Sequence, residues 1–510
     1  ARFHGLMLVF VAAVLVTATA TTLPALIVGW EVMGAASYAL IGFPWREEHS
    51  LAAGMSALLT TRTADLGLYV AAAAALAGSV AGTQAATPVG AAGGGPLALA
   101  DLVDLSPGWR SVAAAGLLVA AAGKAAQLPF SFWLSDAMAG PSPVSALLHS
   151  AAMVAMGGYL LLRVAPLLAA TGWAATAAAW LGALSALALG AVALAQADLK
   201  QTLAASTVAQ LGYVVLAAGV GAVGAGAAQL VAHAATKSLL FLGAGIWSRT
   251  RGGTSLTDTA GAARDQRLVG VTVTVGALAL AGVPPLSLWA TKDAVLAATG
   301  GQSMPLYGVG VAGAALSAAY AARIVAVVWA PRPHAGGSRA APAEQAPLVV
   351  LAGAAAGAGL LVLPPRGGID PAQAAGSALL ALVVTAGVFR AARRGWSWAW
   401  PPARDWLGLP GAVRVLVTRP VMAASALLDR VDHEVVEAAV EGVGRGGLAV
   451  SRRAAAVDVE RVDGAVRAVA RGVRAAGAAA RRPQTGLIHQ YYAQALLLLA
   501  GLVVIVWLVR

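Results

Sequence analysis

The chain has 510 residues, of which 59% are hydrophobic and only 11% are charged, and its formal net charge is +12. Soluble globular proteins carry about 25% charged residues. The composition therefore excludes an ordinary soluble enzyme and predicts an all-α polytopic membrane protein. Cysteine is absent, which excludes disulfides, thiolate metal sites and iron–sulfur ligation on this chain. The positive charge fits loops and lipid headgroups better than nucleic acid.

Apolar segments recur along most of the chain. A membrane-spanning helix needs about 20 apolar residues, and this length predicts about thirteen spans. They lie near residues 5–22, 24–43, 52–82, 109–128, 143–166, 170–196, 202–223, 225–247, 268–299, 305–330, 346–363, 373–391 and 487–509. The longest exceed one crossing, so we expect them to tilt or break. The Gly/Ala/Pro-rich segment 83–108 is predicted to be a surface loop, and 331–345 a polar connector.

The first charged residues inside predicted spans are Glu31, Arg62 and Asp65. No cation is close to Glu31 in the sequence, so this carboxylate requires a partner from another helix, and Lys124 is our candidate. Arg62 and Asp65 are three residues apart and share one helix face. They are either functional charges or a local ion pair.

The segment from Gly123 to Val154 combines apolar residues with charges and prolines. It contains Lys124, Asp136 and His149, and Pro129 lies between the first two. Proline ends or kinks a helix because it lacks the backbone N–H and clashes with the preceding turn. Broken helices at membrane depth occur where they are buried in protein or line a wet cavity. We therefore expect a broken helix that carries Lys124.

The chain contains 30 arginines but only four lysines: Lys124, Lys200, Lys237 and Lys292. Arginine remains protonated, whereas a buried lysine can release its proton. A charge near the centre of a membrane costs about 3 kcal/mol or more and is a functional hypothesis by default. The alternative is a lysine that reaches the surface from a helix end, which we favour for Lys200 alone.

Two further features accompany the lysines. His233 and Lys237 are four residues apart and share a helix face, and Pro284 and Pro285 precede Lys292. This second proline break resembles the one that follows Lys124. A single buried histidine is usually a satisfied hydrogen-bonding group. Two histidines near buried lysines favour a proton relay instead.

The composition changes near residue 403. Residues 411–482 carry apolar side chains every three or four positions among Arg, Asp and Glu, with glycines at 442–447. This pattern predicts a long amphipathic helix that lies along the membrane or along partner helices. The alternative is a soluble tail. A final apolar segment, with Tyr491 and Tyr492 near its start, is predicted to return the chain to the membrane.

These segments together resemble the antiporter-like membrane subunits of respiratory complex I and its relatives, most closely subunit L. The resemblance rests on GWEVMGAASYALIGF, TTRTADLGLY, KAAQLPFSFWLSDAMAGPSPVSALLHSAAMVAMGGYLLLR, ADLKQTLAASTVAQLGYVVLAAG, QLVAHAATKSLLFLGAG and GVPPLSLWATKDAVL. The segments occur in the family's order and cover about residues 1–300.

The resemblance implies the following architecture. Two inverted five-helix repeats would occupy residues 1–168 and 169–330, further spans 331–402, a lateral amphipathic helix 403–486 and an anchor helix 487–510. The family's N-terminal helices would be absent from this chain. The resemblance also implies a proton path through Glu31, Lys124, Lys237 and Lys292, with His149 and His233 as relay and Arg62, Asp65, Asp136 and Asp293 as supporting charges. Gln229 stands where relatives often carry a further histidine.

The implied function is proton translocation in a bacterial NADH–quinone oxidoreductase of the plasma membrane. This chain would carry no cofactor or metal, because FMN, iron–sulfur clusters and quinone would belong to partner subunits. The expected partners are membrane subunits of the J, K, M and N types and the lipid bilayer. Alternatives are an Mrp-type sodium/proton antiporter subunit, the membrane subunit of a hydrogenase or inorganic-carbon uptake complex, and a structural subunit without a proton path.

Overall fold

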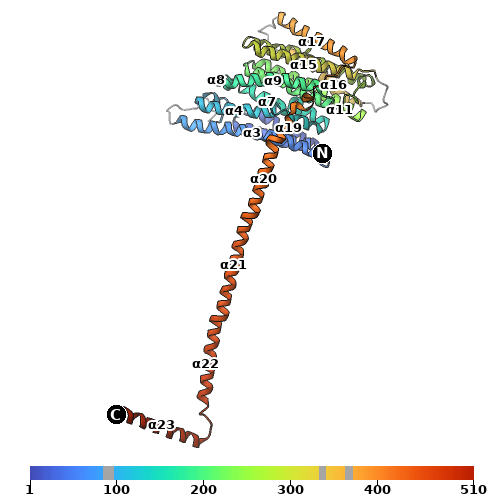
Figure 1. Cartoon of the computed structure of the whole chain (residues 1–510). Coiled ribbons are helices and arrows are strands. Elements are labelled where there is room, and N and C mark those ends of the chain that lie inside the picture. The colour runs from blue at the N-terminus through green and yellow to red at the C-terminus, as the bar shows by residue number, and fades with distance from the viewer. Residues whose placement is uncertain (84–96, 332–339, 362–370) are drawn as a thin grey trace. The chain divides into compact units, whose positions relative to one another are not determined.

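The computed structural model describes the chain except for residues 84–96, 332–339 and 362–370. The described residues form helices (Figure 1) and two isolated β-bridges, so the all-α prediction is confirmed. They divide into two compact units, Ala1–Val413 and Arg414–Arg510, which are described separately. Parts of the predicted loop at 83–108, of the connector at 331–345 and of the span at 346–363 lie outside the described residues.

The first unit contains most of the predicted spans. Its first half comprises α1 (Arg2–Thr19), α2 (Leu23–Ile41), α3 (Glu48–Thr83), η1 (Asp101–Asp104), α4 (Pro107–Lys124), α5 (Phe132–Asp136), η2 (Ala137–Ala139), α6 (Ser142–Ala146), η3 (Leu147–Ala151), α7 (Met153–Arg163) and α8 (Ala165–Thr171). Its second half comprises α9 (Trp173–Ala195), α10 (Leu199–Gly219), α11 (Val223–Arg251), α12 (Ala262–Asp265), α13 (Arg267–Ala281), α14 (Ser287–Gly300), α15 (Met304–Val328), α16 (Pro342–Leu361), α17 (Pro371–Arg393), α18 (Pro401–Arg404), η4 (Trp406–Gly408) and α19 (Leu409–Val413).

Eleven helices within the described residues are long and apolar enough to cross a membrane. The difference from the predicted thirteen has identifiable sources. The predicted span 268–299 is divided between α13 and α14, the helix α4 does not meet this criterion, and the span 346–363 runs into residues that are not described. Trp406–Arg481 meets the criterion although most of it is amphipathic. The chain is therefore a multi-pass membrane protein.

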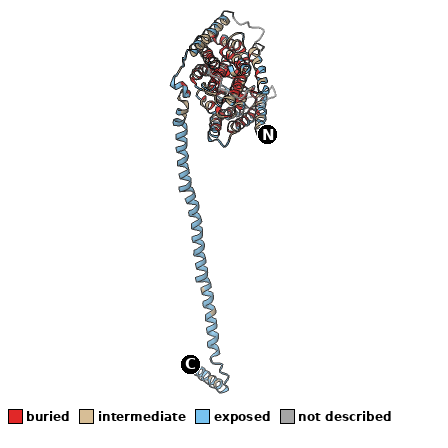
Figure 2. Ribbon diagram, turned by 90° about the vertical axis from the view of Figure 1, so that its right-hand side faces the viewer, coloured by how far each residue is buried: buried red, intermediate tan, exposed pale blue. Residues whose placement is uncertain are grey.

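Small residues allow the helices of the first unit to pack closely. Gly67 on α3 lies against the backbone of Gly116 on α4, and Gly182 on α9 lies against the backbone of Gly212 on α10. A Cβ atom at any of these positions would overlap the opposite backbone. Close approach of this kind stabilises helix pairs in membranes, where burial of apolar surface gives little driving force. Figure 2 shows the buried residues concentrated among these helices.

Two helices of the first unit are broken beside prolines, as predicted. Helix α4 ends at Lys124, five residues before Pro129, and the chain resumes as α5. Helix α13 ends at Ala281, and α14 begins after Pro284 and Pro285. Each break contains a cis X–Pro peptide bond, at Leu128–Pro129 and Pro284–Pro285.

Side chains bond the backbone groups that the first break frees. The Trp133 indole Nε1 donates to the carbonyl of Gly123 at 3.0 Å, and the Leu128 N–H donates to Ser185 Oγ at 3.2 Å. Such partners are required because a free backbone group in a membrane interior costs several kcal/mol. A third irregularity, the π-helical turn η3 that carries His149, had no evident sequence signal.

The two halves of the first unit share local features in the same order. An antiparallel bridge, Thr22 with Ala98, precedes α2, and the bridge of Asp198 with Ser255 precedes α10. In each half a proline break follows. These features are compatible with an internal duplication, but the repeat boundaries 1–168 and 169–330 and their inversion remain predictions.

The second unit is helical throughout most of its length. It comprises η5 (Arg414–Thr418), α20 (Arg419–Val431), η6 (Asp432–Glu437), α21 (Ala438–Val457), η7 (Asp458–Val462), α22 (Asp463–Arg481) and α23 (Ile488–Val509). The glycines at 442–447 lie inside α21 and do not interrupt it. The regular α-helix is interrupted instead by the π-helical turns η5, η6 and η7. The long C-terminal helix is confirmed, whereas its lateral placement and its boundaries remain predictions.

Candidate functional site

Three of the four lysines lie in the interior of the first unit. Lys124 and Lys237 have no exposed surface, and Lys292 is 4% exposed. Each lies on a helix of the apolar core: Lys124 at the end of α4, Lys237 on α11 and Lys292 on α14. Charges are rarely left at such depth without a polar environment. The surroundings of each lysine therefore decide what it can do.

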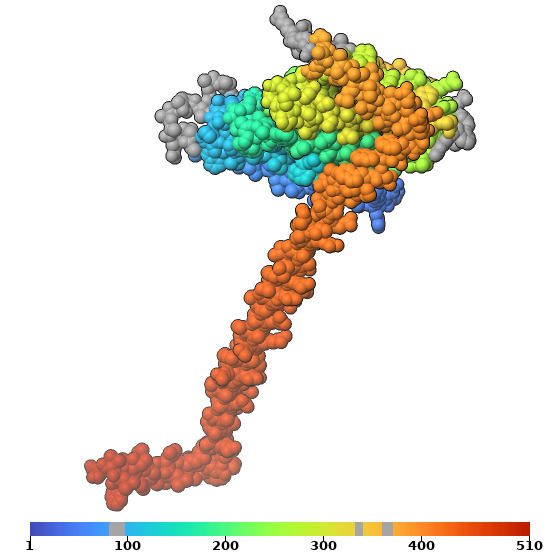
Figure 3. All heavy atoms as spheres, turned by 45° about the horizontal axis from the view of Figure 1, so that its top comes forward, coloured from blue at the N-terminus to red at the C-terminus, as the bar shows by residue number. Residues whose placement is uncertain are grey.

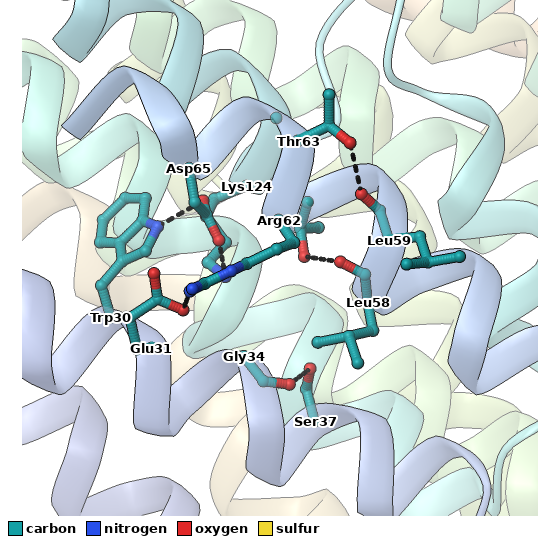
Figure 4. A network of polar contacts seen from close by, with 12 residues as sticks. Trp30, Glu31, Gly34, Ser37, Leu58, Leu59, Arg62, Thr63, Asp65 and Lys124 are labelled. Atoms are coloured by element: carbon teal, nitrogen blue, oxygen red, sulfur yellow. Dashed lines mark hydrogen bonds and ion pairs between the residues drawn. The ribbon is translucent and has the colours of Figure 1, made fainter. Parts of the chain in front are cut away.

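Lys124 forms a buried ion pair with Asp65. Its Nζ lies 3.0 Å from Asp65 Oδ2, and the two side chains are 0% and 2% exposed. The indole of Trp30 donates to the other carboxylate oxygen at 2.6 Å, and the Lys124 Nζ lies 5.6 Å from the centre of the Trp30 ring. A Cβ atom at Gly34 would lie 3.1 Å from Nζ, so glycine leaves space for the amine. Figure 4 shows the cluster.

The predicted partnership of Glu31 with Lys124 is wrong in this structure. Glu31 instead forms an ion pair with Arg62 (Figure 4). It also accepts a hydrogen bond of 2.8 Å from Tyr69. Arg62 and Asp65 are likewise not paired with each other, because Arg62 pairs with Glu31 of α2 and Asp65 pairs with Lys124 of α4. Residues of α2 thus contact both side chains, Trp30 at Asp65 and Glu31 at Arg62.

The two ion pairs differ in exposure. The side chains of Arg62 and Glu31 are 47% and 24% exposed, in contrast to the buried pair of Lys124 and Asp65. The Glu31–Arg62 pair thus lies at the surface of the first unit, on α2 and α3. Both acidic residues named from the sequence are brought to this region, but only Asp65 contacts the lysine.

The histidines lie between the two halves of the first unit. His149 is fully buried, with its ring centre 6.2 Å from those of Trp133 and Phe241. Its turn η3 packs against α11, which carries the fully buried His233. Within the described part of the chain, no ring nitrogen of either histidine has a hydrogen-bond partner of good geometry, although the His233 ring lies close to the backbone of His149.

Other buried polar atoms, either close to the histidines in the sequence or in the break after α4, are also unpaired among the described residues. They are Gln127 Oε1, Ser131 Oγ, Ser150 Oγ and Thr236 Oγ1. Buried polar atoms without protein partners are usually satisfied by internal water. A group of donors and acceptors of this kind can hold a chain of water molecules, and histidine can both take up and release a proton.

Lys237 and Lys292 bond neutral groups. Lys237 Nζ donates to the carbonyl of Leu203 at 2.9 Å and to the hydroxyl of Ser206. Lys292 Nζ donates to the carbonyl of Leu280 at 3.3 Å, near the end of α13, and lies 5.5 Å from the ring centre of Tyr213. The broken helix therefore supplies an acceptor for Lys292. Neutral contacts of this kind accommodate either protonation state.

A hydrogen-bonded network joins the helices of Lys237 and Lys292. Thr291, next to Lys292, donates to Gln229 Oε1 at 2.6 Å, and Gln229 Nε2 donates to Gln210 Oε1 at 3.1 Å. Gln210 Nε2 then donates to Ser317 and Tyr320, each at 2.9 Å. Gln229 is thus held in this network by both its amide nitrogen and its amide oxygen, and an amide, unlike the imidazole of histidine, does not titrate.

The remaining sequence-predicted residues have different environments. Asp136 is exposed and accepts a hydrogen bond of 2.7 Å from Ser56, so it lies apart from the buried charges. Asp293 is 2% exposed and adjoins Lys292. Lys200 donates to the carbonyls of Met138 and Gly140 at 3.2 and 3.0 Å. These contacts support the structural interpretation of Lys200.

Several residues of the site were not predicted from the sequence. Trp30, Gly34, Ser206 and Gln210 contact the lysines or the network that joins them, yet tryptophan, glycine and serine are common in membrane helices. Gln210 had the clearest signal, as an amide in the middle of an apolar helix. No cluster of three or more metal-ligating side chains occurs among the residues that the structure describes.

Comparison with known proteins agrees with this geometry. A family described as "NADH:quinone oxidoreductase/Mrp antiporter, TM" matches residues 20–317. NADH-quinone oxidoreductase subunit L of Escherichia coli (strain K12) is 32% identical over 404 residues, which are 76% of this chain and 63% of that protein. The chloroplastic NAD(P)H-quinone oxidoreductase subunit 5 of Adiantum capillus-veneris is 34% identical over 343 residues, 63% of this chain and 45% of that protein.

Two solved structures have a similar fold. The structure of the Mrp complex from Dietzia sp. matches with a TM-score of 0.58 and 28% identity, covering 94% of this chain and 52% of that chain. The archaeal membrane-bound sulfane sulfur reductase matches with a TM-score of 0.61 and 21% identity, covering 75% and 77%; this second match shows the fold alone.

The family match covers more than half of the chain and includes every buried lysine and both buried histidines. The chain itself spans about half the length of the curated relatives it matches, between 41% and 63% of those proteins. The chain belongs to the NADH:quinone oxidoreductase/Mrp antiporter transmembrane family.

Proposed function

We propose that this chain is a proton-translocating membrane subunit of a bacterial NADH–quinone oxidoreductase in the plasma membrane. One observation carries the proposal: three buried lysines and two buried histidines without ring partners lie on packed helices of one unit. The similarity to subunit L supports the type of complex. NADH, FMN, iron–sulfur clusters and quinone would act in partner subunits of this complex.

The first step would be a change in the ion pair of Lys124. A carboxylate at 3.0 Å stabilises the charged form of the amine. Movement of Asp65 away from Lys124 would remove this stabilisation and favour release of the proton. Redox chemistry in the partner subunits would drive that movement. The neighbouring Glu31–Arg62 pair, on the same two helices as Trp30 and Asp65, is placed to transmit it.

The later steps would use water between neutral groups. The unpaired nitrogens of His149 and His233 would bond water molecules and carry the proton from Lys124 toward Lys237. Lys237 and Lys292 bond backbone carbonyls and can gain or lose a proton without leaving an uncompensated carboxylate. The proton would leave through Lys292. The glutamine network between the two lysines has no titratable member except Tyr320, so transfer between them would also require water.

The proposed partners are membrane subunits of the J, K, M and N types. The half-exposed pair of Arg62 and Glu31 supports this part of the proposal. An ion pair on a membrane helix is costly where it faces lipid and is usually covered by protein or water. A neighbouring subunit bound to α2 and α3 would cover this ion pair, and its own charges would interact with those of Arg62 and Glu31.

A second candidate is a subunit of an Mrp-type antiporter. The similarity to the Mrp complex structure covers 94% of this chain. Residues 1–413 alone are a smaller share of the chain than this, so the similarity extends into the C-terminal helices. The long C-terminal helix therefore does not separate the two candidates. The same buried lysines would then carry protons in a transport cycle that a sodium or proton gradient drives in place of redox energy.

Gentle purification of the tagged chain from its native membranes distinguishes the candidates. We expect flavin- and iron–sulfur-containing subunits to co-purify, as identified by mass spectrometry, together with NADH:quinone activity. Recovery of small antiporter subunits alone, with sodium movement driven by a pH gradient and no NADH oxidation, would contradict the proposal and support the second candidate.

A further inference from the structure

Exposed arginines gather where three helical elements of the first unit meet. Arg264 lies on α12, and Arg390, Arg393 and Arg394 lie in or directly after the last turn of α17. Both elements pack against α15. Helix α17 lies at the surface of the unit, in orange in Figure 3. We call these four residues the arginine cluster.

Two members of the cluster bond the same backbone carbonyl. Arg264 Nε and Arg393 Nη1 each donate to the carbonyl of Trp329 at 3.0 Å, so the two nitrogens are no more than twice that distance apart. Trp329 follows the last residue of α15, and its indole donates to Thr274 on α13 at 2.8 Å. The end of a helix carries only a partial negative charge. One carbonyl therefore holds two guanidinium groups near each other without neutralising them.

No carboxylate neutralises the cluster within the part of the chain that the structure describes. None of its four arginines forms an ion pair there, and Asp265, next to Arg264, pairs with Arg251 on α11. A guanidinium has five N–H donors in a planar fork that matches the oxygens of a phosphate. The bonds to Trp329 use one donor of Arg264 and one of Arg393, so the cluster retains donors for an anion.

An apolar face of α17 leads to the cluster. Leu379 and Val383 are 63% and 60% exposed. They are four residues apart, and Arg390 follows seven residues after Val383, so all three lie on one helix face. Leu379 precedes Arg390 by about 16 Å at 1.5 Å per residue. This distance is close to half of the ~30 Å hydrocarbon core of a bilayer, so the face matches the length of one leaflet.

Tryptophans mark the depth of the cluster in the membrane. Trp396 is 43% exposed, and its backbone N–H donates to the carbonyl of Ala391 at 3.0 Å, which keeps it beside the last turn of α17. Trp398 and Trp400 follow, with their rings stacked at 5.9 Å. Exposed tryptophans are enriched at the level of the lipid headgroups. The arginine cluster therefore lies at the depth of the phospholipid phosphates.

We infer that the arginine cluster binds the phosphate group of an anionic membrane phospholipid, whose acyl chains lie along the exposed face of α17. Arg264 and Arg393 bond the phosphate oxygens, and Arg390 and Arg394 add positive charge. The bound lipid links α12 to α17 across the end of α15. A zwitterionic phospholipid binds less tightly because its headgroup carries its own cation. Since lipid binding requires no proton movement, the inference does not depend on the proposed function.

Photochemical labelling of the purified, delipidated complex tests this site directly. The probe is a phosphatidylglycerol with a diazirine on one acyl chain, and mass spectrometry after proteolysis quantifies labelled peptides that contain Leu379. We expect Arg264→Gln/Arg393→Gln to weaken saturable labelling at least tenfold. Arg2→Gln/Arg46→Gln removes the same charge at two other exposed positions and should leave labelling unchanged. Equal labelling in the wild type and the cluster variant would overturn the inference.

Competition identifies the source of the phosphate. Unlabelled phosphatidylglycerol should displace the probe, whereas phosphatidylcholine with the same acyl chains should require at least tenfold higher concentrations. Glycerol 3-phosphate, which has no acyl chains, should not displace it at the concentration at which phosphatidylglycerol does. Equal competition by phosphatidylcholine would overturn the charge selectivity. Equal competition by glycerol 3-phosphate would show that the site takes a soluble phosphate and would overturn the assignment to a lipid.

A second variant separates lipid binding from helix capping. Arg390→Gln/Arg394→Gln leaves both bonds to the Trp329 carbonyl in place, so the thermal stability of the lipid-free complex should be unchanged. Its labelling should nevertheless weaken severalfold, because two charges beside the phosphate are lost. Wild-type labelling in this variant, together with lower stability but wild-type labelling in Arg264→Gln/Arg393→Gln, would show that the arginines only cap helices and would overturn the inference.

Discussion

Asp65→Asn is expected to destabilise the protein strongly while preserving the shape of the site. The Lys124–Asp65 pair is buried and its atoms are 3.0 Å apart. Removing one member of a buried ion pair costs about 3–5 kcal/mol because the other charge loses its counterion. This is a large part of the roughly 5–15 kcal/mol by which folded domains are stable. Asparagine retains an oxygen to accept the hydrogen bond from Trp30, so the lost charge dominates the effect.

The double variant Asp65→Asn/Lys124→Gln should be more stable than either single variant. Replacement of a buried ion pair by neutral groups is often nearly neutral for stability, and the two amides could share a hydrogen bond. The expected signature is therefore strong non-additivity between the two sites. Asp463 and Arg467 on α22, an exposed pair with atoms 3.4 Å apart, provide the control. Such helix pairs contribute only about 0.3–0.5 kcal/mol.

The assay is thermal denaturation of the purified complex, following the temperature at which half of this chain leaves the soluble fraction. Both single variants at Asp65 and Lys124 should denature well below the wild type, and the double variant should lie between them and the wild type. All three should lose pumping, which separates stability from function. A double variant whose loss of stability equals the sum of the single losses would refute the reasoning.

Three further predictions follow from the same geometry and are measured by proton pumping per electron in proteoliposomes and by thermal denaturation. Gly34→Ala, whose Cβ would lie 3.1 Å from the amine of Lys124, should lower pumping severalfold with NADH oxidation retained; wild-type pumping would show that the amine does not depend on this space. His149→Gln and His233→Gln should each lower pumping about tenfold but change stability by less than about 1 kcal/mol, because the rings have no hydrogen-bond partner among the described residues. A large loss of stability with normal pumping would instead indicate a structural role. Asp136→Asn, at an exposed position, should alter stability by no more than about 0.5 kcal/mol and leave pumping unchanged; a loss of pumping would place this carboxylate in the path.

The membrane-spanning helices were largely predictable because the length of each apolar segment indicates where a helix can cross the membrane. The predicted segment 170–196 corresponds to α9 and 305–330 to α15, with ends that differ by a few residues. The breaks after Lys124 and before Lys292 were predictable because proline forces them. The turn η3 was not, because a π-helical turn depends on packing against α11 and carries no proline or glycine of its own.

The residues of the site were easier to identify from the sequence than their partners. A lysine in an apolar helix is conspicuous, so Lys124, Lys237 and Lys292 stand out. The choice between Glu31 and Asp65 as the partner of Lys124 depends on the rotation of α2 and α3 about their axes, which no local pattern fixes. Compact neutral partners such as the carbonyl of Leu203 have no sequence signal at all.

The proton-to-electron ratio of the purified complex with Lys124→Ala and, separately, Lys237→Ala tests the central claim most directly. Both substitutions remove a buried amine from the first unit, and neither touches a redox group. Measured in proteoliposomes with NADH and quinone, the ratio should fall in both variants while electron transfer persists in the assembled complex. An unchanged ratio in both variants would contradict the account, because protons would then cross the membrane without the buried lysines of this chain.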